Sequence, residues 1–62
     1  MTDLQYEKLY VRLVMQETSF SSYKEDGVFV VKYEGNVVKL SDGLYEKNGV
    51  QYDSFDALMK VL

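Results

Sequence analysis

The residues from Val28 to Tyr33 divide between two faces with a period of two, with Phe29, Val31 and Tyr33 on one face and Val28, Val30 and Lys32 on the other. This period is typical of a β-strand that buries one of its two faces. Gly35-Asn36 follows, and such a dipeptide between apolar runs indicates a two-residue hairpin turn. With this pair in the turn, the predicted register places Tyr33 opposite Val38 and Lys32 opposite Lys39.

A second hairpin is indicated further along the chain. Ser41-Asp42-Gly43 turns the chain into a short strand at 44–47, and Asn48-Gly49 returns it through 50–52. Asn-Gly is the strongest two-residue hairpin signal, because both residues tolerate a positive φ. The cross-strand pairs that follow from this turn are Tyr45 with Tyr52 and Glu46 with Gln51.

The last eight residues predict a short helix, Phe55–Leu62, because their apolar period lengthens to about 3.6. Asp53 or Ser54 precedes it, and either side chain can cap the helix by accepting a hydrogen bond from an amide of the first turn. One face of this helix is apolar and is expected to pack on the sheet. That face consists of Phe55, Leu58, Met59 and Leu62.

The first segment, Thr2–Gln16, fits two structures. As a helix it begins with a capping box formed by Thr2 and Gln5, and it carries its polar side chains on one narrow face. As a strand it would alternate apolar and polar residues from Lys8 to Met15. The capping box and the length of the segment favour the helix.

The connection between these parts, Glu17–Asp26, is polar and rich in serine, which predicts an irregular loop. Phe20 and Tyr23 are its two aromatic residues. They are either exposed anchors for a partner, since aromatic side chains supply much of the binding energy at interfaces, or they fold back over a small core.

These elements together predict one α+β domain, residues 1–62, with an N-terminal helix, an antiparallel meander of three to four strands and a short C-terminal helix. A domain of this size buries only about 60% of the surface that its unfolded chain exposes. The chain has no cysteine and no histidine, so disulfides and the usual zinc sites cannot stabilise it. A homodimer is therefore a reasonable expectation.

Ten acidic residues against seven basic ones give a formal net charge of −3. This balance opposes general attraction to nucleic acids and anionic membranes. No apolar run approaches the ~20 residues that cross a bilayer, and the first residues lack the basic and apolar regions of a signal peptide. We expect a soluble, cytoplasmic protein encoded by a small complete reading frame.

Catalytic chemistry is not indicated by any motif. Without histidine the serines have no Ser-His partner, and the glycines occur singly at turns and not in a phosphate-binding loop. Glu25-Asp26 is the one adjacent acidic pair, and such pairs in loops are most often solvated. We predict no catalytic residue, no cofactor and no metal site, and hence a protein that is not an enzyme.

A pattern in the C-terminal half resembles that of RAMA-like domains and related small bacterial and phage proteins. It is L-x-D-G-φ-φ-x-x-x-G-x-x-Y-x-S-x-x-A, and its matches run from Leu40 to Ala57. The resemblance implies a β-meander before a Ser-capped helix, a phage or mobile-element origin, and a role near DNA linked to restriction and modification. The chain departs from the family where Phe55-Asp56 follows Ser54, because the family has Pro-Ser there.

The first function expected is that of a noncatalytic protein-binding or regulatory protein. Phe20 and Tyr23 would anchor the protein partner, and Glu25 and Asp26 would steer a basic one toward them.

Two alternatives come from other features of the chain. The resemblance implies a nucleic-acid-associated module, whose contacts would be Lys32, Lys39 and Lys47. The small size of the domain favours a self-associating structural subunit.

Overall fold

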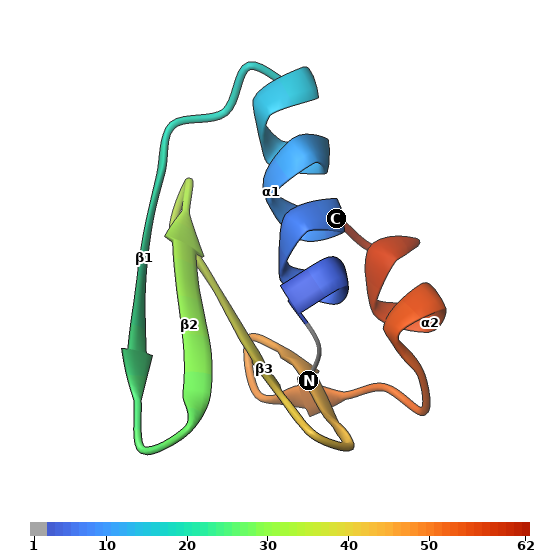
Figure 1. Cartoon of the computed structure of the whole chain (residues 1–62). Coiled ribbons are helices and arrows are strands. Elements are labelled where there is room, and N and C mark those ends of the chain that lie inside the picture. Colours follow the sequence, from blue (N-terminus) through green and yellow to red (C-terminus); the bar gives the residue numbers. More distant parts are fainter. Residues whose placement is uncertain (1–2) are drawn as a thin grey trace.

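The computed structural model describes residues 3–62, with side chains from Leu4 onward. Two helices lie on the same face of an antiparallel sheet of five strands (Figure 1). Each strand pairs with the next one along the chain, which makes the sheet a meander. The elements are α1 (Asp3–Met15), β1 (Phe20–Glu25), β2 (Val28–Tyr33), β3 (Asn36–Ser41), β4 (Leu44–Lys47), β5 (Val50–Gln51) and α2 (Phe55–Met59).

The N-terminal segment is the predicted helix and not a strand. Thr2 lies outside the described residues, so the capping box stays a prediction. The helix ends in a Schellman motif, in which Thr18 donates its backbone N–H to the Leu13 carbonyl and Glu17 donates to Val14, at 3.1 and 3.0 Å. Glu17 takes the positive φ of 56° that this motif requires.

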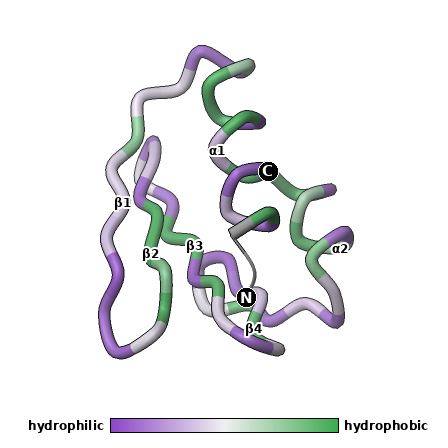
Figure 2. The backbone as a smooth tube through the Cα atoms, viewed as in Figure 1, coloured by the Kyte–Doolittle hydropathy of each residue, from purple (hydrophilic) through white to green (hydrophobic). Residues whose placement is uncertain are grey.

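The segment predicted as an irregular loop, Glu17–Asp26, is largely a strand. β1 pairs with β2 along its whole length, from Phe20 opposite Tyr33 to Glu25 opposite Val28. The sheet therefore has one strand more than the three to four predicted. Figure 2 shows why the pattern concealed it, since β1 is mostly pale or purple whereas β2 is mostly green. Five of its six side chains are exposed, so no buried set reveals a period of two.

The turn between β2 and β3 lies one residue earlier than predicted. Glu34 and Gly35 occupy it, with φ of 45° and 80°, and Asn36 already belongs to β3. Two successive positive φ values match a type I′ turn, whose twist fits a hairpin, and glycine adopts such a φ without steric cost. The Asp26-Gly27 and Asn48-Gly49 turns repeat this pattern.

The moved turn changes the cross-strand partners but not the faces. Val38 lies opposite Val31 and not Tyr33, and Lys39 lies opposite Val30 and not Lys32. Moving a two-residue turn by one position shifts each pairing by two, which preserves the alternation between the faces. The predicted contact between two lysines is therefore wrong, while Phe29, Val31 and Tyr33 share one face of β2 as predicted.

The second hairpin has the predicted register. Glu46 lies opposite Gln51. The Tyr52 N–H donates to the Tyr45 carbonyl at 2.7 Å, so pairing continues just past the end of β5.

Ser54, one of the two predicted caps, begins α2. Its hydroxyl accepts a hydrogen bond from the Ala57 N–H at 3.1 Å. The helix ends at Met59, short of the predicted Leu62. Side chains from other elements donate hydrogen bonds to backbone carbonyls from Met59 onward, which offsets the loss of helical hydrogen bonds. The donors are Arg12 to Met59, Gln16 to Leu62 and Lys47 to Val61.

The core lies between the two helices and the central strands β2 and β3. Side chains from all four elements are buried in one cluster, and further aromatic residues pack around it. No helix in residues 3–62 is long and apolar enough to cross a membrane. The buried cluster consists of Leu9, Leu13, Val31, Tyr33, Val38, Leu40, Phe55 and Leu58.

Candidate functional site

Both helices cover one face of the sheet, which leaves the other face without a helix over it (Figure 1). We call this second side of the sheet the open face. Side chains alternate between the two faces along each strand. One cross-strand row of the open face runs through all five strands, because each member is the register partner of the next. The row is Tyr23, Val30, Lys39, Glu46 and Gln51.

The open face contains a shallow hollow of about 470 Å³ around this row. Val28, Val30 and Leu44 form its apolar part. Val30 is only 4% exposed although it points away from the main core, so its neighbours on the open face cover it. The hollow thus has an apolar floor at its centre and polar side chains around it.

Tyr23 is the aromatic residue of the hollow, and 44% of its surface is exposed. The Lys32 ammonium lies over its ring, 5.6 Å from the ring centroid. At an exposed site such a cation–π contact contributes about 0.5–1 kcal/mol. This contact restrains the ring on the open face and leaves much of its surface accessible.

Charged side chains are distributed unevenly around the hollow. Lys39 lies directly opposite Glu46, a cross-strand arrangement in which opposite charges attract. Glu25 and Asp26 line the end of the hollow at the turn between β1 and β2. That end of the open face is therefore acidic.

The structure brings together three of the four residues predicted to bind a partner, namely Tyr23, Glu25 and Asp26. Phe20 lies on the opposite side of the sheet, because residues three apart in a strand face opposite ways. It packs against the core, with its ring edge-on to that of Tyr10 at 5.2 Å between centroids. Phe20 therefore covers the core, which is the second of the two interpretations that the sequence left open.

The three lysines predicted to contact nucleic acid do not share one surface. Lys32 and Lys39 belong to the open face. Lys47 points to the helix side, where its ammonium donates a hydrogen bond to the Val61 carbonyl. The lysine set is divided between the two faces of the sheet, and Lys47 serves to hold the C-terminal residues.

Sequence reasoning missed the apolar floor and the part played by β4 and β5. Val28, Val30 and Leu44 were assigned no role, since apolar residues on both faces of a short strand give no sign of which face is covered. The Asp26-Gly27 dipeptide was the available signal for β1, because Asp-Gly favours a two-residue hairpin turn. Recognising it would have placed Tyr23 beside Val30.

No metal site accompanies this hollow within the part of the chain that the structure describes. That part contains no group of three or more Asp and Glu side chains, with His and Cys absent, that could hold an ion.

The chain matches no protein-family model, and no curated protein or solved structure compared with it gives a significant match. The resemblance to RAMA-like domains thus stays a prediction from sequence.

Proposed function

We propose that this protein is a small noncatalytic binding or regulatory protein that captures a protein partner on the open face of its sheet. The observation that carries the proposal is the half-exposed ring of Tyr23 beside the apolar floor of Val28, Val30 and Leu44. Tyrosine is enriched among the residues that dominate binding energy, since it offers a large apolar surface and a polar tip.

The charges of the open face favour a basic partner. Glu25 and Asp26 stand at one end of the hollow, while Lys39 faces Glu46 within it. Acidic groups at the rim of a binding surface raise the rate at which a basic partner associates. The chemistry that fits is an apolar or aromatic side chain over the floor, followed by lysine or arginine toward the β1–β2 turn.

The shape of the hollow favours a macromolecule over a small ligand. A small-molecule site encloses most of its ligand, whereas this hollow lies on a sheet face that no helix of residues 3–62 covers. A side chain presented by a larger partner loses little by this openness, because the surrounding contacts exclude water from it.

Tyr23→Ala tests the proposal. Proteins from the native host that bind the immobilised wild-type chain are identified, and their affinities for the wild type and for Tyr23→Ala are compared. We expect the substitution to weaken binding by about thirtyfold, the size typical of a dominant interface residue. Circular dichroism shows whether the variant remains folded.

Tyr10→Ala is the matched control, because Tyr10 is a similarly exposed tyrosine on α1. It should leave the affinity unchanged. A partner bound equally well by the wild type and by Tyr23→Ala would remove the open face from consideration.

The same experiment separates protein capture from nucleic-acid association. A nucleic-acid partner would bind with an affinity that falls steeply as salt is added, and it would be lost on replacing Lys32 and Lys39 with alanine. Binding that is lost when Tyr23 is replaced, and that depends only weakly on salt, supports the function proposed.

A further inference from the structure

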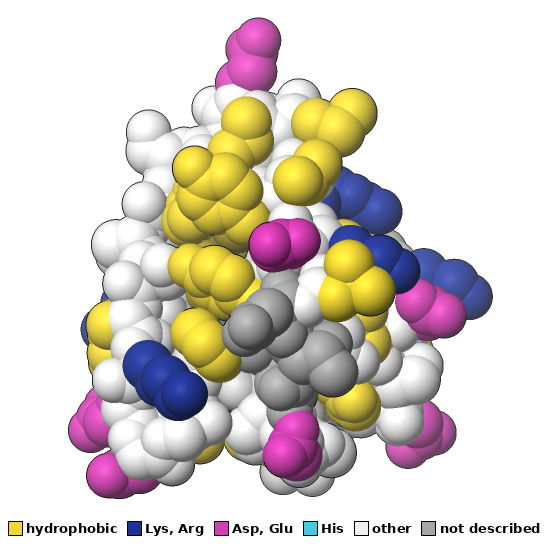
Figure 3. All heavy atoms as spheres, in the orientation of Figure 1, with side chains coloured by type: hydrophobic (Ala, Val, Ile, Leu, Met, Phe, Trp, Pro, Cys, Tyr) yellow, Lys and Arg dark blue, Asp and Glu magenta, His cyan; other side chains and the backbone are white. Residues whose placement is uncertain are grey.

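The outer side of α1 exposes several large apolar side chains to solvent. Among residues 4–62, eight large hydrophobic side chains are exposed, and five of these belong to α1. Figure 3 shows hydrophobic side chains gathered over this helix, with basic side chains beside them. Met15, at 77% exposed, and Val11, at 52%, are two of them.

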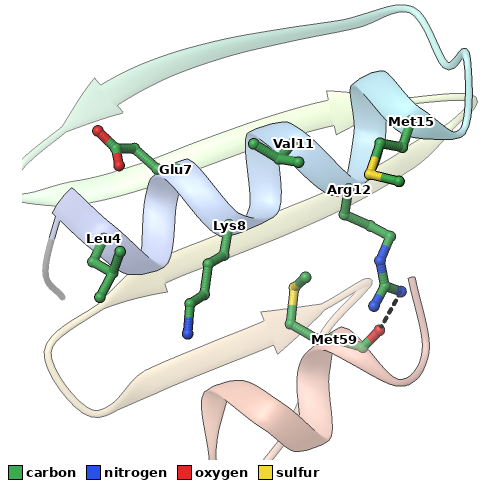
Figure 4. Close-up of a pocket in the computed structure, with 7 residues that line it drawn as sticks. All are labelled: Leu4, Glu7, Lys8, Val11, Arg12, Met15 and Met59. Carbon is green, nitrogen blue, oxygen red and sulfur yellow. Dashed lines mark hydrogen bonds between the residues drawn. The ribbon is translucent and has the colours of Figure 1, made fainter.

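Four residues along this outer side follow the spacing of a coiled-coil seam. Leu4, Lys8, Val11 and Met15 are separated by four, three and four positions, as the a and d residues of a heptad are. They line a hollow of about 410 Å³ together with Glu7, Arg12 and Met59 of α2 (Figure 4). We call these four residues the α1 seam.

Opposite charges flank the α1 seam. In Figure 4 Glu7 projects from one side of the helix, and Lys8 and Arg12 project from the other. In heptad terms Glu7 is at position g and Arg12 at the following position e. When two such helices pack in parallel, position g of one meets the next position e of the other, and these charges set partner choice and orientation.

A second copy of the chain therefore complements the charges beside the α1 seam in one orientation. Parallel packing brings Glu7 of each copy to Arg12 of the other, which makes two attractive pairs by symmetry. Antiparallel packing brings Glu7 to Val14 and Arg12 to Gln5, so neither pair joins opposite charges. Charge complementarity selects the parallel arrangement.

We propose that this protein forms a symmetric homodimer in which the α1 seams of two copies pack in parallel. Lys8 lies at the centre of the seam, and its side chain reaches Glu7 of the other copy, so it fixes the register at some cost in stability. One Arg12 nitrogen donates to the Met59 carbonyl at 3.1 Å, and a guanidinium has five N–H donors with which to make this further contact.

The dimer is independent of the proposed function. The α1 seam lies on the helix side of the sheet (Figure 1), so dimerisation through it leaves both open faces accessible. A variant that loses one surface is expected to keep the other.

Single-cysteine variants test the arrangement, because the chain has no cysteine of its own. In the parallel dimer Val11 meets Val11 of the other copy, so Val11→Cys should be converted largely to a disulfide-linked dimer on mild oxidation. Val50→Cys is the matched control, since this valine on β5 is 55% exposed and lies outside the seam. It should remain mostly monomeric. Equal cross-linking of the two variants overturns the proposal.

Sedimentation gives a second, noncovalent test. The wild type should show a mass of about twice 7.2 kDa, and Glu7→Arg and Arg12→Glu should each weaken dimerisation by about tenfold. Mixing these two variants should restore the dimer, because each Arg then faces a Glu. Circular dichroism verifies that both fold, and Tyr23→Ala should dimerise like the wild type. A wild type that stays monomeric up to about 1 mM, or mixed folded variants that do not associate, overturns the proposal.

Discussion

Tyr33 shows at the scale of one residue how the sheet changes the chemistry of a side chain. It is buried in the core cluster at the end of β2. Burial raises the pKa of its phenol above the ordinary value of 10.0, and the neighbouring Glu34 carboxylate raises it further. Both causes disfavour the phenolate, so the folded protein retains this proton at a pH where the unfolded chain loses it.

This pKa shift predicts a loss of stability in alkaline solution. The contribution of Tyr33 is fully present below pH 10.0 and is lost as the pH rises through the raised pKa of the folded state. Melting temperatures measured from pH 8 to pH 11 should fall more steeply for the wild type than for Tyr33→Phe, which has no proton to lose. Parallel curves for the two proteins would show that burial of this phenol does not govern the alkaline transition.

Asn48 connects two elements and explains why the second hairpin stands where it does. It adopts a positive φ of 53° in the turn between β4 and β5. Its side-chain oxygen accepts a hydrogen bond from the Val37 N–H, and its side-chain amide donates to the side-chain oxygen of Asn36, both at 2.9 Å. The turn of one hairpin thereby holds the first residues of β3.

Asn48→Gly separates these two roles. Glycine adopts the positive φ but makes neither side-chain hydrogen bond, so we expect a loss of about 1–2 kcal/mol in the free energy of unfolding by urea. Asn48→Asp retains the acceptor for Val37 and loses the donor to Asn36, and it should fall between the two. If the Asn48→Gly variant is as stable as the wild type, the side chain of Asn48 contributes only to the turn.

The whole molecule is stabilised by one small core to which α2 contributes much. Leu58 is fully buried and lies in the same cluster as Leu9 and Leu13 of α1. A chain of 62 residues is expected to have a free energy of unfolding of about 3–9 kcal/mol. One buried leucine thus accounts for a large part of the net stability.

Leu58→Ala should therefore destabilise the protein by about 2–5 kcal/mol, enough to unfold a large fraction of it at 37 °C. Thermal and urea unfolding measure the effect. Val61→Ala, which truncates an exposed residue just after α2, is the control and should change stability by about 0.5 kcal/mol or less. A small effect of Leu58→Ala would show that α2 docks without stabilising the sheet.

Local patterns predicted both helices, the four strands β2 to β5 and the turn of the second hairpin. They succeeded there because the relevant signals are local, namely a period of 3.6 or two, the Ser54 cap and the Asn48-Gly49 turn. The same local logic failed for β1, whose polar side chains show no buried face. It also failed for the end of α2, where the carbonyl partners come from Arg12, Gln16 and Lys47 in distant elements.

The sequence by itself determined the order of the helices and of most strands, since the period of the apolar residues, the helix cap and the turn dipeptides are local signals. Only the tertiary structure decided which residues meet across the sheet. It placed Tyr23 with Glu25 and Asp26 on the open face, turned Phe20 toward the core, and divided Lys47 from Lys32 and Lys39. The physical reason is that a binding face assembles residues from separate strands, and their relative positions depend on pairing register and on which face the helices cover.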